Sequence, residues 1–295
     1  MKLNIVTERG NREVGVLQGI SGTTTISQLK STLFDIKNKS SKFNVNRIKL
    51  STGDRKSLED SKCVNDYQLK ENDTLLYKDL GPQIGWSTVF VAEYAGPLLL
   101  YPVFYYFAPI IYGLDRPKHS IQTVALICYS LHYLKRILET IFIHRFSHGT
   151  MPLRNLFKNC SYYWGCTIMV SYFVNHPLFT APSQTKQLIG LTLWAVGEIS
   201  NFICHYQLMN LRPPGTTERR IPRGFLFELL SCPNYTVEIL AWLGFSIMTQ
   251  TLTAFVFTLM GAAQMWVWAV GKHRRYRKDF PNYPKSRKIL IPFLL

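Results

Sequence analysis

Long apolar runs alternate with short basic loops from Gly81 onward, whereas residues 1–80 are polar and charged. Six of these runs approach the ~20 residues that a helix needs to cross a bilayer. They lie at roughly 86–108, 120–143, 160–179, 187–209, 225–243 and 246–270. The pattern therefore predicts that residues 81–295 form an all-α membrane bundle of about six transmembrane helices. The fifth run is the least regular, because polar residues and Pro233 interrupt it.

Residues 1–80 show the alternation and turn residues of a small α+β domain. Gly10-Asn11 lies between two alternating segments, as in a β-hairpin. Thr25 can cap a helix over residues 26–37, because a threonine hydroxyl accepts hydrogen bonds from the first helical turn. The expected strands are residues 2–6, 13–17, 47–51 and 74–77, and the expected buried helix face is Ile26, Leu29, Leu33 and Ile36. This order of elements resembles the ubiquitin-like β-grasp and predicts a separate domain at residues 1–80.

The charge balance is strongly basic, with 34 Lys and Arg against 18 Asp and Glu. Much of the excess borders apolar runs, in residues 212–223 and 272–288. Basic residues beside membrane helices collect on the cytosolic side of the membrane. With six spans, this rule places both termini in the cytosol and leaves only Arg116, Lys118 and Lys186 in the opposite loops. The arrangement favours membrane lipid, and not nucleic acid, as the partner of the basic residues.

Several common kinds of site are missing from the sequence. The six cysteines include no C-x-x-C pair, so they predict neither a disulfide framework nor a zinc site. His144 and His148 form a single H-x-x-x-H pair, which offers too few ligands for a membrane di-iron centre. Neither a G-x-G-x-x-G nor a P-loop motif occurs, which argues against a Rossmann or P-loop nucleotide site. No metal cofactor is expected.

Polar residues recur at helical spacing inside the second and fourth apolar runs. In the second run, His132, Lys135 and Glu139 fall on one helical face, with Arg136 beside them. The fourth run repeats the pattern with Glu198, Asn201 and His205. Charged side chains inside a span usually face the bundle interior, which favours a functional cavity. The alternatives are a Lys135–Glu139 pair that only neutralises itself or snorkels to the cytosolic end, and plain interhelical hydrogen bonds.

The fifth run and the basic tail add to this polar set. Asn234 and Glu238 lie four residues apart on one face, and Pro233 interrupts the backbone hydrogen bonds before them. Irregular backbone at membrane depth is tolerated where it lines a cavity, and a plain kink is the alternative. The apolar end 289–295 can dock the basic stretch 272–288 onto the bundle, unless that stretch is a solvated patch facing lipid. A cavity with arginines at its mouth suits a phosphate-bearing ligand with polar rings.

Motifs of the C-terminal part resemble the steroid 5α-reductase superfamily. They are Leu211-Arg212-Pro213-Pro214-Gly215, Ile221-Pro222-Arg223-Gly224, Cys232-Pro233-Asn234-Tyr235 with Glu238, and the segment from Tyr283 to Phe293. This resemblance covers residues 187–295. Two further stretches, residues 79–97 and 135–147, narrow it to the very-long-chain trans-2-enoyl-CoA reductase branch of the superfamily and extend it over nearly the whole chain.

The resemblance implies an enzyme of the endoplasmic reticulum membrane that uses NADPH to reduce the trans-2 double bond of a long-chain 2-enoyl-CoA. It implies a long-chain acyl-CoA substrate and, as partners, other enzymes of fatty-acid elongation, in which this is the last step of each cycle. Tyr235 and Lys135 would be the catalytic pair. The positions that would bind NADPH are Asn201, Arg212, Asn234, Glu238, Tyr276 and Arg287. His205 stands where the steroid reductases have Asp, which departs from the superfamily's pattern beside the cofactor.

Three other functions remain open at this point. A steroid or polyprenol reductase would use the same chemistry on another acceptor, although the N-terminal domain and Tyr235 argue against it. A ubiquitin-like membrane adaptor would have no need for the polar residues inside the spans. A membrane methyltransferase could also place a basic tail over a small bundle, but the motifs between Pro213 and Arg223 do not favour it.

Overall fold

The computed structural model describes residues 1–37, 45–146, 149–211, 219–292 and 294. The chain divides into two compact units. The first contains Met1–Trp86 together with the segment that carries strand β6 (Thr150–Pro152), and the second contains the helices that follow. β6 pairs antiparallel with β5 (Gln83–Gly85), the strand directly before the first long helix.

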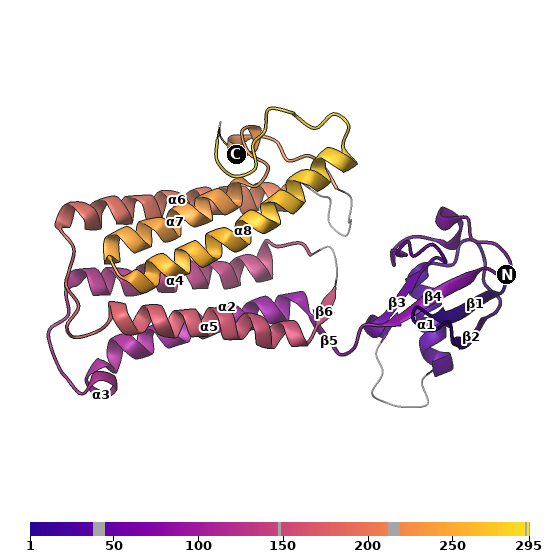
Figure 1. Cartoon of the computed structure of the whole chain (residues 1–295), viewed down its shortest axis with the longest axis horizontal. Coiled ribbons are helices and arrows are strands. Elements are labelled where there is room, and N and C mark those ends of the chain that lie inside the picture. The colour runs from indigo at the N-terminus through magenta and orange to yellow at the C-terminus, as the bar shows by residue number, and fades with distance from the viewer. Residues whose placement is uncertain (38–44, 147–148, 212–218, 293, 295) are drawn as a thin grey trace. The chain divides into compact units, whose positions relative to one another are not determined.

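The N-terminal unit is a mixed four-stranded sheet with one helix (Figure 1). Its elements are β1 (Leu3–Thr7), β2 (Glu13–Leu17), α1 (Ile26–Lys37), β3 (Ile48–Ser51) and β4 (Thr74–Asp79). The strand order is β2-β1-β4-β3, in which β1 and β4 run parallel and the other pairs antiparallel. The predicted hairpin is confirmed, since Gly10 and Asn11 both have positive φ, as a tight hairpin turn requires.

Helix α1 begins where the sequence predicts. The Thr25 hydroxyl accepts a hydrogen bond from the Gln28 amide at 3.2 Å, and the Gln28 side chain accepts one from the Thr25 amide at 2.8 Å. This reciprocal pair is a capping box. Ile26, Leu29 and Leu33 are fully buried against the sheet. Ile36 is on the same face, but its side chain is 48% exposed, because it is the second-last residue of the helix.

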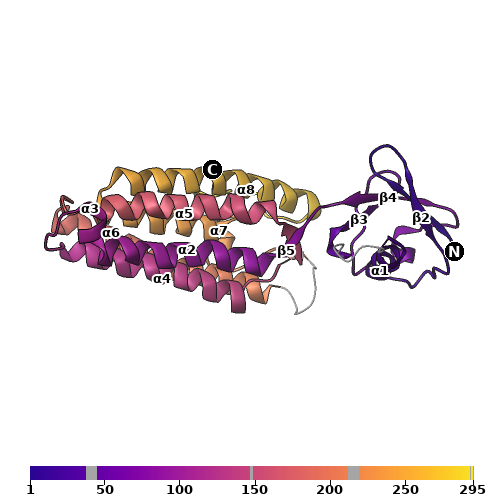
Figure 2. The same ribbon diagram turned by 90° about the horizontal axis from the view of Figure 1, so that it is seen from below.

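The second unit is a bundle of long helices that run side by side (Figures 1 and 2). They are α2 (Trp86–Tyr106), α4 (Ser120–Phe142), α5 (Arg154–Val174), α6 (Gln184–Asn210), α7 (Pro233–Thr249) and α8 (Leu252–Asp279), with the short α3 (Ala108–Tyr112) after α2. Each long helix overlaps one predicted apolar run. Among the described residues, α2, α6 and α8 are long and apolar enough to cross a membrane. The others are less suited, because α7 has only 17 residues and α4 and α5 contain polar as well as charged side chains.

Two helix boundaries correct the sequence-based expectations. Pro233 does not kink a helix; it occupies the first position of α7, where the missing N–H would have no helical partner. The residues before it form only a short 3₁₀ turn, Phe225–Glu228. Helix α8 runs to Asp279 and not to about residue 270, so the first part of the basic stretch, residues 272–279, is helical. Its side chains are therefore held on defined faces of a helix.

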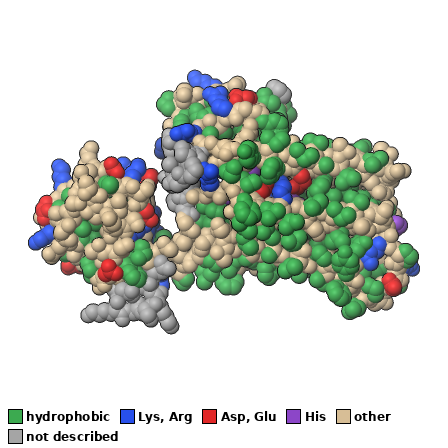
Figure 3. Space-filling view, turned by 180° about the vertical axis from the view of Figure 1, so that it is seen from behind, with side chains coloured by type: hydrophobic (Ala, Val, Ile, Leu, Met, Phe, Trp, Pro, Cys, Tyr) green, Lys and Arg blue, Asp and Glu red, His purple; other side chains and the backbone are tan. Residues whose placement is uncertain are grey.

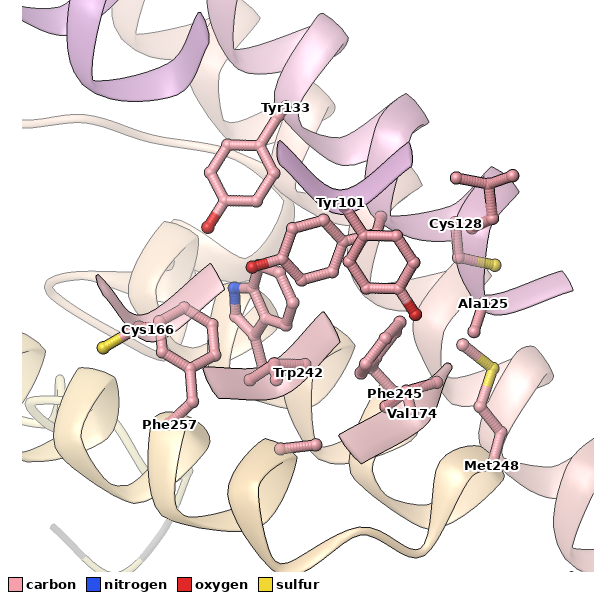
Figure 4. Packing of buried hydrophobic residues seen from close by; sticks show 14 of the residues in the cluster. Tyr101, Ala125, Cys128, Tyr133, Cys166, Val174, Trp242, Phe245, Met248 and Phe257 are labelled. Atoms are coloured by element: carbon pink, nitrogen blue, oxygen red, sulfur yellow. The ribbon is translucent and has the colours of Figure 1, made fainter. Parts of the chain in front are cut away.

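Aromatic side chains fill the core of the bundle (Figure 4). Trp242 on α7 joins two neighbours, since its ring centroid lies 5.5 Å from that of Tyr129 on α4 and 4.8 Å from that of Phe257 on α8. Tyr101 on α2 stacks on Tyr129 at 4.4 Å. These contacts bring four helices to one centre. The Trp242 ring also lies 4.6 Å from the ring of His132, so the apolar core borders the polar residues of α4 directly.

Helices α6 and α7 approach each other closely at glycines. A Cβ atom on Gly197 would lie 2.7 Å from backbone atoms of Val237 and Ala241. A Cβ on Gly190 would lie 2.5 Å from the Gly244 carbonyl oxygen. Close backbone contact through small residues is the usual way in which membrane helices associate. The contact fixes the position of α6 along the axis of α7. It lies one helical turn from the polar residues of the two helices that face each other.

The outside of the bundle is largely apolar. Figure 3 shows hydrophobic side chains over most of one face of the helical unit, with few charges among them. On α4, Leu131, Leu138 and Ile141 are each about half exposed, on the side away from the polar residues. Such a continuous exposed apolar surface is typical of a protein whose surroundings are lipid.

The C-terminal segment returns to the start of α7, as the sequence predicts. The amides of Ser231 and Cys232 donate hydrogen bonds to the carbonyls of Lys288 and Ile289. The Thr236 hydroxyl donates to the Leu290 carbonyl at 2.6 Å. Leu290 is buried beside Cys232. Docking of this segment onto the bundle is therefore confirmed for the described residues up to Leu290.

Candidate active site

A buried polar network connects α4, α6 and α7. The Glu198 carboxylate on α6 lies 2.7 Å from His132 Nδ1 and 2.7 Å from Lys135 Nζ, both on α4. Lys135 Nζ also donates a 2.7 Å hydrogen bond to Asn201 Oδ1. Asn201 Nδ2 in turn donates to Glu238 Oε2 on α7 at 2.9 Å. The polar faces that the sequence predicts on three separate helices therefore meet at one place.

A second group lies on the next turns of α4 and α6. Arg136 Nη1 donates to Glu139 Oε2 at 2.8 Å, and Arg136 Nη2 donates to the Tyr94 hydroxyl of α2 at 3.1 Å. His205 Nδ1 lies 3.0 Å from the same Glu139 oxygen. His205 thus faces a carboxylate that α4 supplies.

Glu139, His144 and His205 form a cluster with the composition of a metal site. One possible ligand atom from each lies within 4.8 Å of the others. Arg136 already neutralises the Glu139 carboxylate, and its positive charge opposes a divalent cation. Burial, together with the neighbouring Arg136 charge, lowers the pKa of His144, in the loop after α4, to about 3. The positive charge of Arg136 therefore both favours the neutral form of His144 and balances the Glu139 carboxylate.

Two cavities meet beside these groups. The inner cavity, of about 250 Å³, is lined mostly by apolar and aromatic side chains of the bundle, and Asn201 and Glu238 are among its polar groups. The basic cavity, of about 420 Å³, is lined by six cationic side chains and one carboxylate, Asp279. Both cavities are lined by Arg136, His205, Asn234 and Tyr235. A ligand with a charged body in the basic cavity could therefore place a reactive end against Tyr235.

The residues predicted to bind the cofactor are distributed unevenly. Asn234 lies at the boundary of the two cavities, and its backbone carbonyl accepts a 3.0 Å hydrogen bond from Asn201 Nδ2. Asn201 and Glu238 line the inner cavity, and Tyr276 lines the basic cavity. Arg212 lies outside the described residues.

Arg287 occupies a different environment. Its Nη1 donates to the Pro222 carbonyl at 2.9 Å, its Nη2 lies 3.4 Å from a Glu228 carboxylate oxygen, and its guanidinium stands over the Tyr283 ring. It is almost completely buried and lines neither cavity. In the described structure it joins the C-terminal segment to the turn before α7.

The two residues predicted as the catalytic pair lie in different environments. Tyr235 lines both cavities, whereas Lys135 lines neither of them in the described structure and lies behind Asn201. Lys135 reaches α7 through the Asn201 amide and, by way of Glu198 and His132, through Glu238. The ammonium group that stands over the Tyr235 ring is that of Lys272, 4.7 Å from the ring centroid.

Some residues of the site have no clear signal in the sequence. Tyr94 and Trp242 look like ordinary apolar positions of their helices, although both line the inner cavity. Lys272 belongs to a basic cluster that resembles a solvated tail. Only the continuation of α8 past residue 270 places it over the cavity. A longer helical pattern through Tyr276 would have been the signal to follow.

The arrangement provides the parts that a reductase of conjugated double bonds needs. The inner cavity could hold an acyl chain, and the basic cavity could hold phosphates. The arrangement also has a phenol at the boundary that can donate a proton or a hydrogen bond to developing negative charge. Amide and carboxylate groups of Asn201, Asn234 and Glu238 converge at the same boundary, where they can orient a polar ring.

The chain is similar to known proteins along its whole length. Residues 149–295 match the family described as 3-oxo-5-alpha-steroid 4-dehydrogenase. The chain is 58% identical to a very-long-chain enoyl-CoA reductase of Dictyostelium discoideum, over 99% of each protein. It is 47% identical to a probable very-long-chain enoyl-CoA reductase of Caenorhabditis elegans, over 98% of the chain and 97% of that protein. It is also 38% identical to a putative enoyl-CoA reductase of Trypanosoma brucei brucei, over the full length of both.

Proposed function

The chain belongs to the very-long-chain enoyl-CoA reductases, and we propose on that basis that it reduces the trans-2 double bond of a 2-enoyl-CoA to the saturated acyl-CoA. The reaction is the last step of the fatty-acid elongation cycle. The single observation that supports it best is the meeting of an apolar and a basic cavity at Tyr235. A thioester with an apolar chain needs the first cavity, and a phosphate-bearing reductant needs the second.

NADPH is the proposed cofactor. An oxidoreductase of this family requires a nicotinamide cofactor, and the side chains of the basic cavity fit one that carries several phosphates. When bound, NADPH supplies the hydride that adds to C3 of the enoyl group. Arginines hold phosphates through paired, charge-assisted hydrogen bonds, and Arg219, Arg220 and Arg275 line this cavity. Asn201, Asn234 and Glu238, where the cavities meet, are positioned to orient the nicotinamide end.

Tyr235 is the proposed acid of the reaction. Hydride addition at C3 leaves negative charge on the enoyl thioester, delocalised between C2 and the carbonyl oxygen. The Tyr235 hydroxyl can stabilise that charge and deliver the proton that C2 takes up. Lys135 acts on the site indirectly. Its ammonium donates a hydrogen bond to the Asn201 side chain, whose nitrogen donates to a backbone carbonyl of α7. The aromatic walls of the inner cavity exclude water from the reacting carbons.

The protein is a membrane protein, and we propose six spans formed by α2, α4, α5, α6, α7 and α8 in the endoplasmic reticulum. The short helix α7 is flanked by other helices, and the charges of α4 face the bundle, which makes their insertion feasible. Both termini would be cytosolic. Residues 1–80 would form a ubiquitin-like domain, and residues 81–295 the reductase, whose part from 187 binds NADPH. Membrane lipid and other elongation enzymes are the proposed partners.

Purified protein in detergent provides the decisive test. NADPH should be oxidised only when a trans-2-enoyl-CoA is supplied, and mass spectrometry should find one saturated acyl-CoA for each NADPH consumed. The saturated acyl-CoA of the same length is the negative control, and a 3-oxo steroid with a conjugated double bond is the competing substrate. Oxidation driven by the steroid and not by the enoyl-CoA would refute the proposal. In sealed microsomes, protease should remove tags from both termini without opening the membrane.

A further inference from the structure

A lysine of α8 stands over the proposed acid of the reaction. Lys272 Nζ lies 4.7 Å from the centroid of the Tyr235 ring, within the range of a cation–π contact. Both side chains line the basic cavity. Tyr235 is half-buried in the first turn of α7, and Lys272 is open to the cavity from the C-terminal part of α8. Two helices therefore hold a phenol and an ammonium group against each other.

A local clamp fixes this pairing. The Ser231 hydroxyl lies 2.6 Å from His273 Nδ1 and 2.7 Å from the Tyr283 hydroxyl. His273 is the neighbour of Lys272, and Ser231 lies four residues before Tyr235. The Ser231 amide also donates to the Lys288 carbonyl at 2.8 Å. The turn of α8 that carries Lys272 is thus attached to the start of α7, just below Tyr235.

Lys272 differs from Lys135 in its carboxylate partners. Lys135 Nζ has the Glu198 carboxylate at 2.7 Å and Glu139 at 4.0 Å. Among the residues that the structure describes, no carboxylate lies within 4 Å of Lys272 Nζ, and the ammonium stands over the Tyr235 ring. An ammonium group without a carboxylate partner can respond to a negative charge that forms nearby.

We propose that Lys272 is the positioning residue of Tyr235: its ammonium holds the phenol at the boundary of the two cavities and stabilises the phenolate left after proton donation. The role rests on the proposed enoyl-CoA reduction. In that reaction the hydride forms the new C3–H bond, and the electron pair of the double bond moves to C2 and the thioester carbonyl. The Tyr235 O–H bond then breaks as C2–H forms. The phenolate regains its proton from water through the basic cavity.

A set of four variants tests this role: Lys272→Met, Lys272→Arg, Tyr235→Phe and the double variant Lys272→Met/Tyr235→Phe. Lys272→Met should lower kcat about 10- to 100-fold, the size of one charge-assisted hydrogen bond, with the KM for NADPH changed less than about twofold. Lys272→Arg should recover part of kcat, because it keeps the charge but not the shape of the group. The double variant should be no slower than Tyr235→Phe, since Lys272 acts through the phenol.

Isotope effects separate this role from a structural one. Without the ammonium, proton transfer becomes slower relative to hydride transfer. The effect of D₂O on kcat should then rise in Lys272→Met, and the effect of deuterated NADPH should fall. Lys278→Met is the matched control, because Lys278 lies on the same helix but outside both cavities, and it should behave like the wild-type protein.

The kinetic constants and the Tm distinguish the ways in which the proposed role of Lys272 could be wrong. A raised KM for NADPH with unchanged kcat would make Lys272 a ligand of the cofactor and overturn the inference. Multiplicative losses in the double variant would also overturn it, as would a lowered Tm with unchanged isotope effects. Wild-type protein that ignores enoyl-CoA altogether would instead refute the proposed function, and with it this role.

Discussion

The ammonium group of Lys135 donates a 2.7 Å hydrogen bond to the side-chain oxygen of Asn201. This bond fixes which way the amide points, because the oxygen faces the ammonium and the nitrogen faces α7. The nitrogen donates to the Asn234 carbonyl at 3.0 Å and to Glu238 at 2.9 Å. Lys135 therefore influences the backbone directly before Tyr235 without lining either cavity.

We expect Lys135→Met to lose most activity and to lower Tm. The substitution leaves the Glu198 carboxylate with His132 as its remaining close partner, and breaking a buried ion pair costs about 3–5 kcal/mol. The second substitution should neutralise Glu198, whose carboxylate lies 2.7 Å from Lys135 Nζ, and not Glu139, which lies 4.0 Å away. Lys135→Met/Glu198→Gln should therefore recover stability. It should not recover activity, because the Asn201 amide is no longer oriented.

Turnover and thermal unfolding in detergent measure both effects. Lys135→Met/Glu139→Gln is the comparison, and it should recover less stability than the Glu198 double variant. A stable and fully active Lys135→Met/Glu198→Gln protein would mean that Lys135 only neutralises charge and has no part in orienting Asn201.

Tyr235→Phe should remove most turnover and leave NADPH binding almost unchanged. The substitution deletes one hydroxyl and keeps the ring that packs beside Trp268. Loss of a single donor to a developing oxyanion typically lowers kcat by about 10²–10³. Tyr206→Phe is a suitable control, since Tyr206 is exposed on α6 and lines neither cavity. A kcat for Tyr235→Phe close to that of the wild type would move the proton donor to water or to another residue.

The spacing of polar residues was enough to predict half of the site. Because α-helices repeat every 3.6 residues, the sequence places Lys135 and Glu139 on one face of α4, and Asn201 and His205 on one face of α6. Burial of unpaired charge is costly, so these faces had to turn toward each other. Their meeting in the structure follows from that constraint, and so does the presence of Glu198 and Glu238 between them.

The other half depends on tertiary contacts that no local pattern encodes. Lys272 lies over Tyr235 only because α8 continues past residue 270 and Ser231 holds it to α7. Arg287 stays a predicted cofactor-binding residue, and its guanidinium contacts the Pro222 carbonyl and Glu228 in the described structure. An isolated arginine in a basic sequence gives no indication of which of several acceptors it will find.

Gly197→Ala should destabilise the bundle and reduce activity. Its Cβ would lie 2.7 Å from backbone atoms of α7, and backbone cannot rotate away as a side chain can. Overpacking of this kind costs about 1–3 kcal/mol. The helices would separate one turn from Asn201 and weaken its 2.9 Å bond to Glu238. Gly165→Ala on α5 is the control, because a Cβ there would have no described atom within 4 Å, and its Tm should not fall. Equal Tm values for the two variants would contradict the close approach of α6 and α7.

Arg275 provides the test of cofactor choice. It lines the basic cavity, and no carboxylate lies within 4 Å of its guanidinium among the described residues, whereas Arg219 is paired with Asp279 at 2.9 Å. NADPH differs from NADH by one 2′-phosphate, so a cation that holds this group sets the preference between them. Arg275→Gln should raise the KM for NADPH about 10- to 100-fold, the size of one charge-assisted hydrogen bond, and change the KM for NADH little.

The control for this test is Arg277→Gln, on the same helix but outside both cavities. It lowers the net charge by the same amount, so it corrects for any general loss of electrostatic attraction. Its KM values for both cofactors should match those of the wild-type protein. If Arg275→Gln raised both KM values equally, Arg275 would bind the pyrophosphate common to the two cofactors. If wild-type protein used NADH as efficiently as NADPH, the basic cavity would hold no 2′-phosphate at all, and its six cations would have to serve the phosphates of the acyl-CoA.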